Sequence, residues 1–430
     1  MRGRGDSGSE SAYLVGLDFK ERHAAWPADV SLAELETLLD TVGAIPCGRR
    51  TFVVRRINPA TLIGSGQAKL IAEESEELNC DAIVFDSDLK PRQQRNLEKI
   101  IGAKIVDRTS LILDVFALRA TTAEGKLQVE RAQIEYVLPR LSDLWVEFSR
   151  TGGGIGTRGP GETQIEVDRQ QLRTRLAEID RRLENVRSRR SLARQSRTKK
   201  GVPTVAIVGY TNAGKSSLLN ALSEGGAFVE DKLFATLDPL TRRVDLPDSR
   251  SVMATDTVGF MQRLPTRLIA AFRATLEEVQ AADLLIHVVD LSAENLSGQI
   301  ASVEETLEQL DVLSKPIITV LNKVDLVANP GEVVTPDTVA VSAKTGAGLD
   351  DLRSQIAVRL AEDESAISVA IPFSEGRLVD LFHREGKVDS VEFTPDGTVI
   401  EGRIPTRLEI KFQPFKSRAD RPANVREENP

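Results

Sequence analysis

One eight-residue segment constrains the fold of this chain more than any other feature of its 430 residues. The apolar run Val205–Val208 leads directly into G-x-x-x-x-G-K-S at Gly209–Ser216, and a helical pattern follows. A glycine-rich turn between a buried strand and a helix presents backbone N–H groups to phosphate, and the helix N-terminus adds positive potential. The segment therefore predicts an α/β fold with a nucleotide phosphate site. The residues assigned to this site are Gly209, Tyr210, Thr211, Asn212, Ala213, Gly214, Lys215, Ser216 and Ser217.

Three more motifs follow in chain order at the ends of predicted strands. Asp256–Gly259 has the form D-x-x-G, Asn322–Asp325 has the form N-K-x-D, and Ser342–Lys344 reads S-A-K. A carboxylate at Asp325 accepts hydrogen bonds from the N1–H and exocyclic amine of guanine, a donor pair that adenine lacks. The four motifs together predict an enzyme that binds GTP and GDP and hydrolyses GTP. The further nucleotide-binding residues are Asp256, Gly259, Asn322, Lys323, Asp325, Ser342, Ala343 and Lys344.

The residue types suggest roles within the site. Lys215 is expected to reach the β- and γ-phosphates, and the Gly259 N–H is expected to meet the γ-phosphate. The predicted ligands of a Mg²⁺ ion are Ser216, Thr236 and Asp256. Thr236 lies in a segment between the phosphate loop and Asp256 that is expected to close on the metal in the GTP state.

A water-orienting glutamine is missing where many small GTPases place one. Phe260 follows D-x-x-G here, and its ring has no group that orients water. Either hydrolysis is slow or another group supplies charge in the transition state. One candidate is the Asn212 carbonyl oxygen, which would hold a K⁺ ion beside the phosphates, and another is a glutamine from elsewhere in the chain. The predicted catalytic set is Lys215, Thr236, Gly259 and Asn212, with Thr236 preferred over Thr241.

Short apolar runs alternate with helical patterns in residues 11–125, which predicts a small α/β domain with a mostly parallel sheet. Residues 1–10 are predicted to be a disordered tail. Ser31 is predicted to cap the first helix of the domain. Strands are expected at 13–19, 51–57, 82–86 and 104–107, and helices at 31–43, 66–79 and 89–102.

Residues 126–200 change to a heptad pattern, which predicts an antiparallel helical hairpin. Pro139 is expected to kink its first helix. The connector Thr151–Gly161 holds six glycines, more than a turn between helices needs, so we expect a ligand to approach its backbone closely. The apolar positions are Ile134, Val137, Leu141, Leu144 and Phe148, then Leu172, Leu176, Ile179, Leu183 and Val186. The predicted RNA contacts are Arg150, Gly152, Gly153, Gly154, Gly156, Arg158, Gly159 and Gly161.

The charge of the chain is unevenly distributed. It has 56 basic and 64 acidic residues, and the net charge of −8 taken alone argues against a nucleic-acid partner. Residues 165–200, however, hold 12 basic and five acidic residues and carry +7, which leaves −15 elsewhere. Charged runs are usually solvated faces, but the run from Arg187 to Lys200 has a single sign and suits a phosphate backbone.

Several protein classes are excluded. No apolar stretch approaches the roughly 18 residues of a membrane helix, and no apolar region of a secretory signal follows the basic N-terminus. Cys47 and Cys80 lie far apart in the sequence, so we expect neither a disulfide scaffold nor a zinc site, and we expect a reducing cytoplasm.

The C-terminal half of the chain contains two predicted domains. Residues 201–364 contain the predicted GTPase domain, and residues 365–415 predict a small α+β domain. Its strands are expected at 368–373, 390–393, 398–404 and 409–412, with a helix at 377–384. Residues 416–430 are predicted to be a disordered tail.

Three stretches resemble the HflX family of ribosome-associated GTPases. They are Gly152–Asp168 (GGGIGTRGPGETQIEVD), Phe234–Arg242 (FATLDPLTR) and Asp256–Glu278 (DTVGFMQRLPTRLIAAFRATLEE). The glycine-rich run discriminates most, because ordinary GTPases lack it. The G domain also looks like the translation-associated GTPases that have no catalytic glutamine.

The resemblance implies an α/β N-terminal domain, a helical hairpin and a Ras-like GTPase domain. It also implies GTP-dependent binding to the large ribosomal subunit and its rRNA, with the hairpin tip near the peptidyl-transferase centre, and splitting or rescue of stalled ribosomes. We expect a monomer. ATP hydrolysis by the N-terminal domain has been proposed within the family, and the short loop Gly64–Gln67 is the only hint of it here.

Two other functions stay open at this point. The chain could be a GTPase of ribosome assembly or tRNA modification, or a stress-regulated interaction protein whose nucleotide state switches its affinity for a partner.

Overall fold

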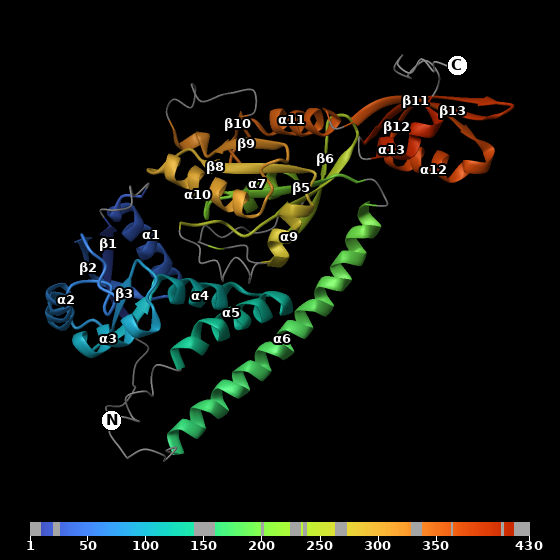
Figure 1. The fold of residues 1–430 in the computed structure, drawn as a ribbon. Helices are drawn as coiled ribbons and strands as arrows, with labels where there is room; N and C mark the ends of the chain where they lie inside the picture. Colours follow the sequence, from blue (N-terminus) through green and yellow to red (C-terminus); the bar gives the residue numbers. More distant parts are fainter. Residues whose placement is uncertain are drawn as a thin grey trace, which may run out of the picture.

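A computed structural model describes residues 10–19, 26–141, 160–198, 202–223, 234, 239–262, 273–327, 338–362, 364–405 and 408–416. It confirms the predicted α/β class, with an N-terminal parallel α/β domain, a helical region, a P-loop domain and a small C-terminal domain (Figure 1). No helix in these ranges is long and apolar enough to cross a membrane.

The N-terminal domain is a four-stranded parallel sheet in the order β2-β1-β3-β4 with helices on both faces. Alternate residues of β1 point to opposite sides, so Leu14 packs in the core beneath α1 and α4 while Tyr13 and Val15 pack beneath α2 and α3. The elements are β1 (Ser11–Phe19), α1 (Ala28–Thr41), β2 (Ile45–Val54), α2 (Ser65–Glu77), β3 (Ala82–Phe85), α3 (Pro91–Ile101), β4 (Lys104–Asp107) and α4 (Arg108–Arg119).

Two local predictions for this domain need correction. Ser31 is not the cap of α1, because the helix begins three residues earlier, after Pro27, and Ser31 is a buried residue inside its first turn. Helix α4 had no counterpart among the predicted elements. It begins directly after β4, and Asp107 caps it by accepting a hydrogen bond from the Ser110 N–H at 2.8 Å.

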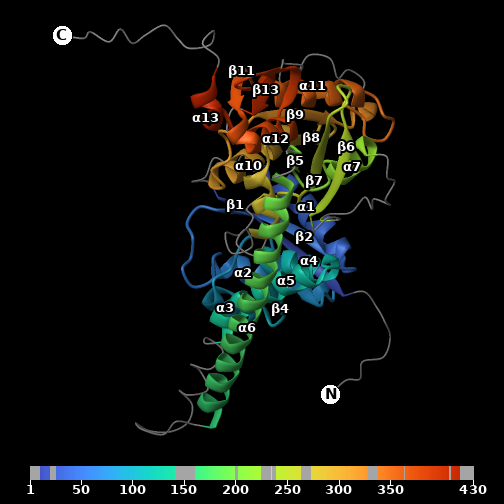
Figure 2. The same ribbon diagram turned by 90° about the vertical axis from the view of Figure 1, so that its right-hand side faces the viewer.

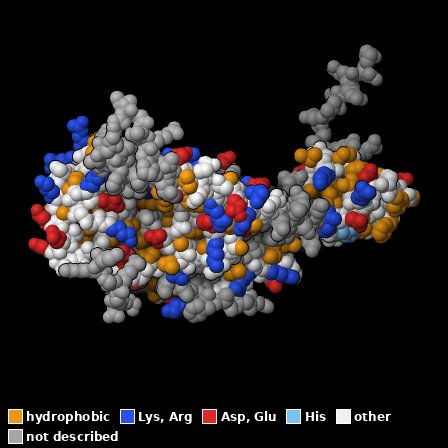
Figure 3. All heavy atoms as spheres, turned by 90° about the horizontal axis from the view of Figure 1, so that it is seen from below, with side chains coloured by type: hydrophobic (Ala, Val, Ile, Leu, Met, Phe, Trp, Pro, Cys, Tyr) orange, Lys and Arg blue, Asp and Glu red, His pale blue; other side chains and the backbone are white. Residues whose placement is uncertain are grey.

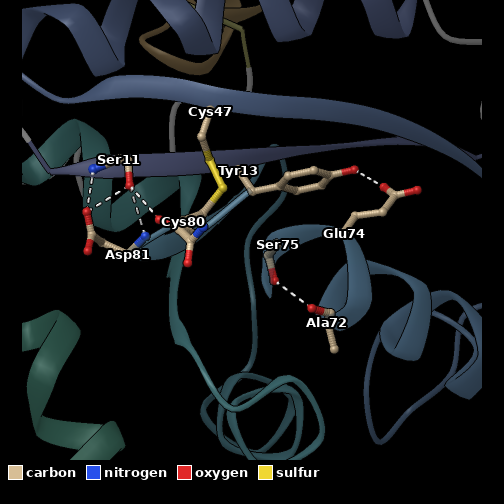
Figure 4. Close-up of a disulfide and its surroundings, with 9 residues drawn as sticks. Ser11, Tyr13, Cys47, Ala72, Glu74, Ser75, Cys80 and Asp81 are labelled. Atoms are coloured by element: carbon tan, nitrogen blue, oxygen red, sulfur yellow. Dashed lines mark hydrogen bonds between the residues drawn. A yellow bond between two sulfur atoms is a disulfide. The ribbon is translucent and has the colours of Figure 1, made fainter. Parts of the chain in front are cut away.

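The expectation that the two cysteines stay apart is wrong. Cys47 on β2 and Cys80, which precedes β3, form a disulfide (Figure 4). They are 33 positions apart in the sequence, and the segment between them includes α2, which returns the chain across the sheet, so their Cα atoms lie 6.2 Å apart. Sequence separation is a poor guide to distance in a βαβ crossover, because the crossover brings its two ends together. The cysteines therefore give no argument for a reducing compartment.

Helices α5 (Ala123–Leu141) and α6 (Pro160–Thr198) form the helical region. They pack against each other through ion pairs of Arg175 with Glu130 at 2.6 Å and of Arg131 with Asp180 at 2.7 Å. Helix α6 has 39 residues, about 58 Å at 1.5 Å per residue. It runs past α5 toward the G domain, and its N-terminal end lies far from that domain (Figures 1 and 2).

The predicted apolar stripes fit α6 better than α5. Ile179 on α6 is fully buried, whereas Val137 on α5 is 39% exposed. Helix α5 buries Val129 and Ala132 because it packs against α4 as well as α6, so a single heptad seam does not describe it. Pro139 lies inside α5 near its end. The predicted seam positions Leu144 and Phe148 lie outside the described residues.

The G domain is a six-stranded sheet in the order β10-β9-β8-β5-β7-β6, parallel except for β6. The strands β5, β8 and β9 are apolar and buried at its centre. The elements are β5 (Thr204–Gly209), α7 (Lys215–Leu222), β6 (Leu240–Asp245), β7 (Ser251–Asp256), α9 (Arg273–Ala281), β8 (Leu284–Asp290), α10 (Leu296–Gln309), β9 (Ile317–Asn322), β10 (Thr338–Ala340) and α11 (Leu349–Glu362).

The C-terminal domain is an antiparallel sheet in the order β11-β13-β12, packed against α12. Figure 3 shows hydrophobic side chains gathered on this end of the molecule, where Phe373, Phe393 and Ile410 are 64%, 78% and 79% exposed. The elements are β11 (Glu364–Pro372), α12 (Gly376–Glu385), β12 (Lys387–Thr394), β13 (Gly397–Pro405) and α13 (Glu409–Phe412).

The last predicted strand is wrong, because Glu409–Phe412 forms the short helix α13. Leu408 and Phe412 are both buried and lie four residues apart, which places them on one side of a helix. The domain also extends to Lys416, which forms a β-bridge with Val369 and an ion pair with Glu409 at 2.6 Å.

Candidate nucleotide site

The phosphate loop connects β5 to α7 at the carboxyl edge of the sheet. Gly209 and Gly214 have φ of +152° and +89°, and a Cβ at either position would overlap the Val288 carbonyl or the Asn322 amide. Glycine is therefore required at both ends of the loop. Asn212 between them adopts the left-handed conformation, with φ of 61°, and is exposed at the rim of the loop.

Lys215 is held beneath the loop. Its Nζ donates to the carbonyl oxygens of Gly209 at 3.2 Å and Tyr210 at 2.7 Å. Burial lowers the pKa of Lys215 to about 8, and the charge of Asp256 opposes this only in part. Burial and the charge of Lys215 together lower the pKa of His287 on β8 to about 4, so His287 is neutral and Lys215 is the cation of this pair at pH 7.

Two predicted metal ligands meet beside the loop. Ser216 lies in the first turn of α7, and its Oγ donates to Asp256 Oδ2 at 2.6 Å. Asp256 ends β7 and is fully buried. A hydroxyl and a carboxylate oxygen are the hard ligands that Mg²⁺ prefers, so this donor pair fits a magnesium ion. The third predicted ligand, Thr236, lies outside the described residues.

The predicted base-binding motifs are joined to the phosphate loop by Asn322. Its Nδ2 donates to the Ala213 carbonyl at 2.9 Å, and its Oδ1 accepts from the Ala343 N–H at 3.0 Å. Ser342 Oγ donates to Asp325 Oδ1 at 2.7 Å and so orients that carboxylate. The phosphate loop, N-K-x-D and S-A-K are thus brought together in space.

The segment after D-x-x-G packs directly against the phosphate loop. The Phe260 N–H donates to the Gly209 carbonyl at 3.0 Å, and the Thr211 N–H donates to the Phe260 carbonyl at 2.7 Å. The Phe260 ring is only 1% exposed and lies in the core. A Cβ on Gly259 would lie 2.9 Å from Lys215 Nζ, so the backbone of Gly259 and the lysine share one side of the site.

The predicted RNA contacts are not part of this cluster. Gly161 lies in the first turn of α6, at the end of the helix that is remote from the G domain (Figure 1). The other predicted contacts, Arg150 to Gly159, lie outside the described residues.

Sequence reasoning missed that the site borders the N-terminal domain. Tyr210 Oη donates to Glu34 Oε1 at 2.5 Å, and Ser31 Oγ donates to Gln262 Oε1 at 2.9 Å. One available signal was Asp86, a charged residue directly after the buried strand β3. The carboxyl end of a parallel strand is where polar residues of a site gather.

Comparison with known proteins finds family models and relatives that match most of the chain. Family models match residues 29–117 ("GTP-binding GTPase N-terminal"), 119–197 ("GTP-binding GTPase Middle Region") and 204–323 ("50S ribosome-binding GTPase"). The GTPase HflX of Caldanaerobacter subterraneus subsp. tengcongensis is 44% identical over 90% of each chain. The GTPase HflX of Escherichia coli is 40% identical over 94% of this chain and 96% of its own. A crystal structure of SsGBP with GDP covers 81% of this chain and 98% of its own, at 25% identity and a TM-score of 0.43.

The fold and the four assembled motifs define a P-loop GTPase, an enzyme that binds GTP and GDP and hydrolyses GTP. Sequence identities of 44% and 40% to the two HflX proteins, over 90% and 94% of this chain, narrow this class further. The chain belongs to the HflX family of GTPases.

Proposed function

We propose that this GTPase binds the large ribosomal subunit in its GTP state and splits or rescues stalled ribosomes, and that hydrolysis releases it. The observation that carries the proposal is the long helix α6, whose N-terminal end lies far from the G domain (Figure 1). The glycine-rich segment directly precedes this end in the sequence, so an RNA contact there lies well away from the nucleotide. The match of residues 204–323 to a model described as a 50S ribosome-binding GTPase supports the same partner.

Within the nucleotide site, the chain's own residues have separate roles in this proposal. The Lys215 ammonium and the Gly259 N–H stabilise the negative charge that develops on the transferred phosphoryl group. Ser216, Asp256 and Thr236 hold Mg²⁺, which supplies charge neutralisation to the phosphates. Asn212 would hold K⁺, which would supply beside the phosphates the positive charge that an arginine finger supplies in other GTPases.

The RNA contacts in this proposal are the hairpin-tip residues, which present backbone and two guanidinium groups to rRNA. They are Arg150, Gly152, Gly153, Gly154, Gly156, Arg158, Gly159 and Gly161. The protein acts as a monomer in the cytoplasm, where its ribosomal partner is.

Sedimentation through a sucrose gradient with purified ribosomal subunits tests the proposal. With a non-hydrolysable GTP analogue, the protein should co-migrate with large subunits, and with GDP it should stay at the top. Arg150→Ala with Arg158→Ala should abolish co-migration, whereas Arg49→Ala, an exposed arginine on β2, should not. Failure of the wild-type protein to co-migrate in the analogue, or co-migration with small subunits alone, refutes the proposed partner.

A further inference from the structure

The two cysteines of the chain meet at one end of the N-terminal sheet. Cys47 lies near the start of β2 and Cys80 lies just before β3, and both side chains are partly buried (Figure 4). Asp86 follows the opposite end of β3, where Ser31 joins it to Gln262 of the G domain. The disulfide therefore lies at the end of β3 that points away from this contact with the G domain.

A bulge in β2 turns Cys47 out of the strand ladder. Tyr13 on β1 pairs with Gly48, and the residue before Tyr13 pairs with Pro46, so Cys47 is an extra residue with no partner on β1. An extra residue of this kind bends its strand and redirects its side chain. A Cβ on Gly48 would lie 2.9 Å from the Tyr13 ring, so the strand approaches β1 closely at this point. The backbone of β2 itself thus directs Cys47 toward Cys80.

Cys80 is held in place by hydrogen bonds that do not involve its sulfur. Its N–H donates to the Ser75 carbonyl at 2.9 Å, and the Asp81 N–H donates to the Ser11 carbonyl at 2.9 Å. Asp81 Oδ2 in turn accepts from the Ser11 N–H at 2.8 Å (Figure 4). Both cysteines also pack against the core beneath α2 and α3. The fold therefore brings the two sulfur atoms together without needing the covalent bond.

The compartment in which the chain acts makes this bond conditional. Cytoplasmic thiols are kept reduced, and the disulfides that form there are usually transient or redox-sensing. The inference rests on the proposed function in one respect only, which is that a ribosomal partner places the chain in the cytoplasm. Both cysteines are partly exposed, so a small thiol or disulfide reaches them.

We propose that Cys47 and Cys80 are a reversible oxidation site, which a low-molecular-weight disulfide closes and an excess of the corresponding thiol reopens. The thiolate of one cysteine attacks the small disulfide and releases one small thiol. The thiolate of the other cysteine then attacks the resulting mixed disulfide, which forms the protein bond and releases the second small thiol. The protein gives up two electrons and two protons, and the small disulfide takes them up.

Closing the bond stabilises the N-terminal domain without changing the nucleotide site. The bond joins positions 33 apart in the sequence, so it removes conformational freedom from the unfolded chain. The folded chain loses little, because its backbone already holds the two cysteines together. GTP turnover is expected to stay the same, because the bond lies at the end of β3 that points away from the G domain contact.

The test uses the purified full-length chain in its reduced form. Incubation with glutathione disulfide should convert its two free thiols to none, and mass spectrometry should find the peptides of Cys47 and Cys80 joined. Excess reduced glutathione should restore both thiols. The oxidised form should have a midpoint of thermal unfolding about 10 °C higher than the reduced form, with GTP turnover unchanged.

The matched control is the double variant Cys47→Ser with Cys80→Ser, which keeps side chains of similar size and the bulge of β2. Its midpoint of unfolding should equal that of the reduced wild-type protein. Neither glutathione disulfide nor reduced glutathione should change that midpoint.

Several results overturn the proposal. Thiols that stay free in glutathione disulfide, or a glutathione that remains attached to one cysteine, would show that the pair does not close. A bond that excess reduced glutathione leaves intact would make it a permanent structural disulfide. Equal midpoints of unfolding, or a change in GTP turnover on oxidation, would contradict the proposed effect. None of these assays contains ribosomes, so they are independent of whether the chain binds the large subunit.

Discussion

Replacing Asp325 with asparagine should change the base that the enzyme accepts. In the structure, Ser342 Oγ donates to Asp325 Oδ1 at 2.7 Å, which orients the carboxylate. We expect it to accept two hydrogen bonds, from N1–H and the exocyclic amine of guanine. An asparagine would replace one carboxylate oxygen by an NH₂ group, which would face the exocyclic amine of guanine, so that two donors meet. Xanthine has an oxygen in place of that amine and can accept a hydrogen bond from the asparagine.

The size of the effect follows from the two bonds. A hydrogen bond to a charged group contributes about 1.5–3 kcal/mol and a neutral one about 1 kcal/mol. The amide loses one bond and makes the other neutral, so GDP binding weakens by about 2–5 kcal/mol, or roughly 30- to 5,000-fold. Ser342→Ala removes only the orienting hydroxyl and leaves the carboxylate. That variant should weaken GDP binding by about 1 kcal/mol, or roughly fivefold.

Competition of GDP and XDP against a fluorescent guanine nucleotide measures both affinities in wild type, Asp325→Asn and Ser342→Ala. In the Asp325→Asn enzyme, XDP should bind more tightly than GDP. If that variant keeps the wild-type affinity for GDP, the base does not contact Asp325 and the base site has been wrongly assigned.

Three further outcomes are expected from other parts of the molecule. Because burial lowers the pKa of Lys215 to about 8, and bound phosphate favours the charged amine, GDP binding at pH 9 should take up about 0.9 proton and affinity should fall as pH rises above 8. Calorimetry in buffers of different ionisation enthalpy measures this, and zero uptake at pH 9 contradicts it. Phe382→Ala should destabilise the C-terminal domain by about 3–5 kcal/mol in chemical denaturation and leave GTP turnover unchanged, because the ring is fully buried against Phe412. In a Trp145→Phe background, nucleotide addition should change the emission of Trp26, which stacks on Tyr210; an unchanged spectrum would show that the stack is insensitive to nucleotide.

The nucleotide site was predictable because each of its motifs is contiguous and local. A strand, a glycine turn and a lysine at a helix start are set by neighbours in the sequence, and the edge of a parallel sheet then brings such turns together. Asn322 shows the limit of this reasoning. Its motif was found, but the bonds to Ala213 and Ala343 that fix the distance between phosphate loop and base loop depend on the folded sheet.

Most of the wrong predictions have a different cause, which is contact between segments that are far apart in the sequence. Serine is a common helix cap, but the Ser31 hydroxyl instead contacts Asp86, 55 residues away in the sequence, and Gln262, 231 residues away. Cys47 and Cys80 were judged by their separation in sequence, and the α2 crossover removes that separation. The strand expected at Glu409–Phe412 rested on alternation over four residues, a length at which strand and helix periods are hard to distinguish.

The structure also changes how the charge of α6 should be interpreted. Of the six arginines on α6 whose side chains are described, five pair with carboxylates: Arg169, Arg173, Arg175, Arg182 and Arg187. Two of these pairs hold α6 to its neighbours, Arg175 to Glu130 on α5 and Arg187 to Glu277 on α9, the latter at 2.6 Å.

Arginines used in this way help to fix the position of α6, and they are poorly placed to give up those partners for RNA phosphates. These pairs lie almost entirely in the mixed-sign part of α6, whereas the single-sign run from Arg187 to Lys200, of which only Arg187 has a described basic side chain, stays a prediction for RNA binding. A helix that is tied to α5 and, through Arg187, to α9 of the G domain would connect an event at the proposed glycine-rich tip to the domain that binds the nucleotide.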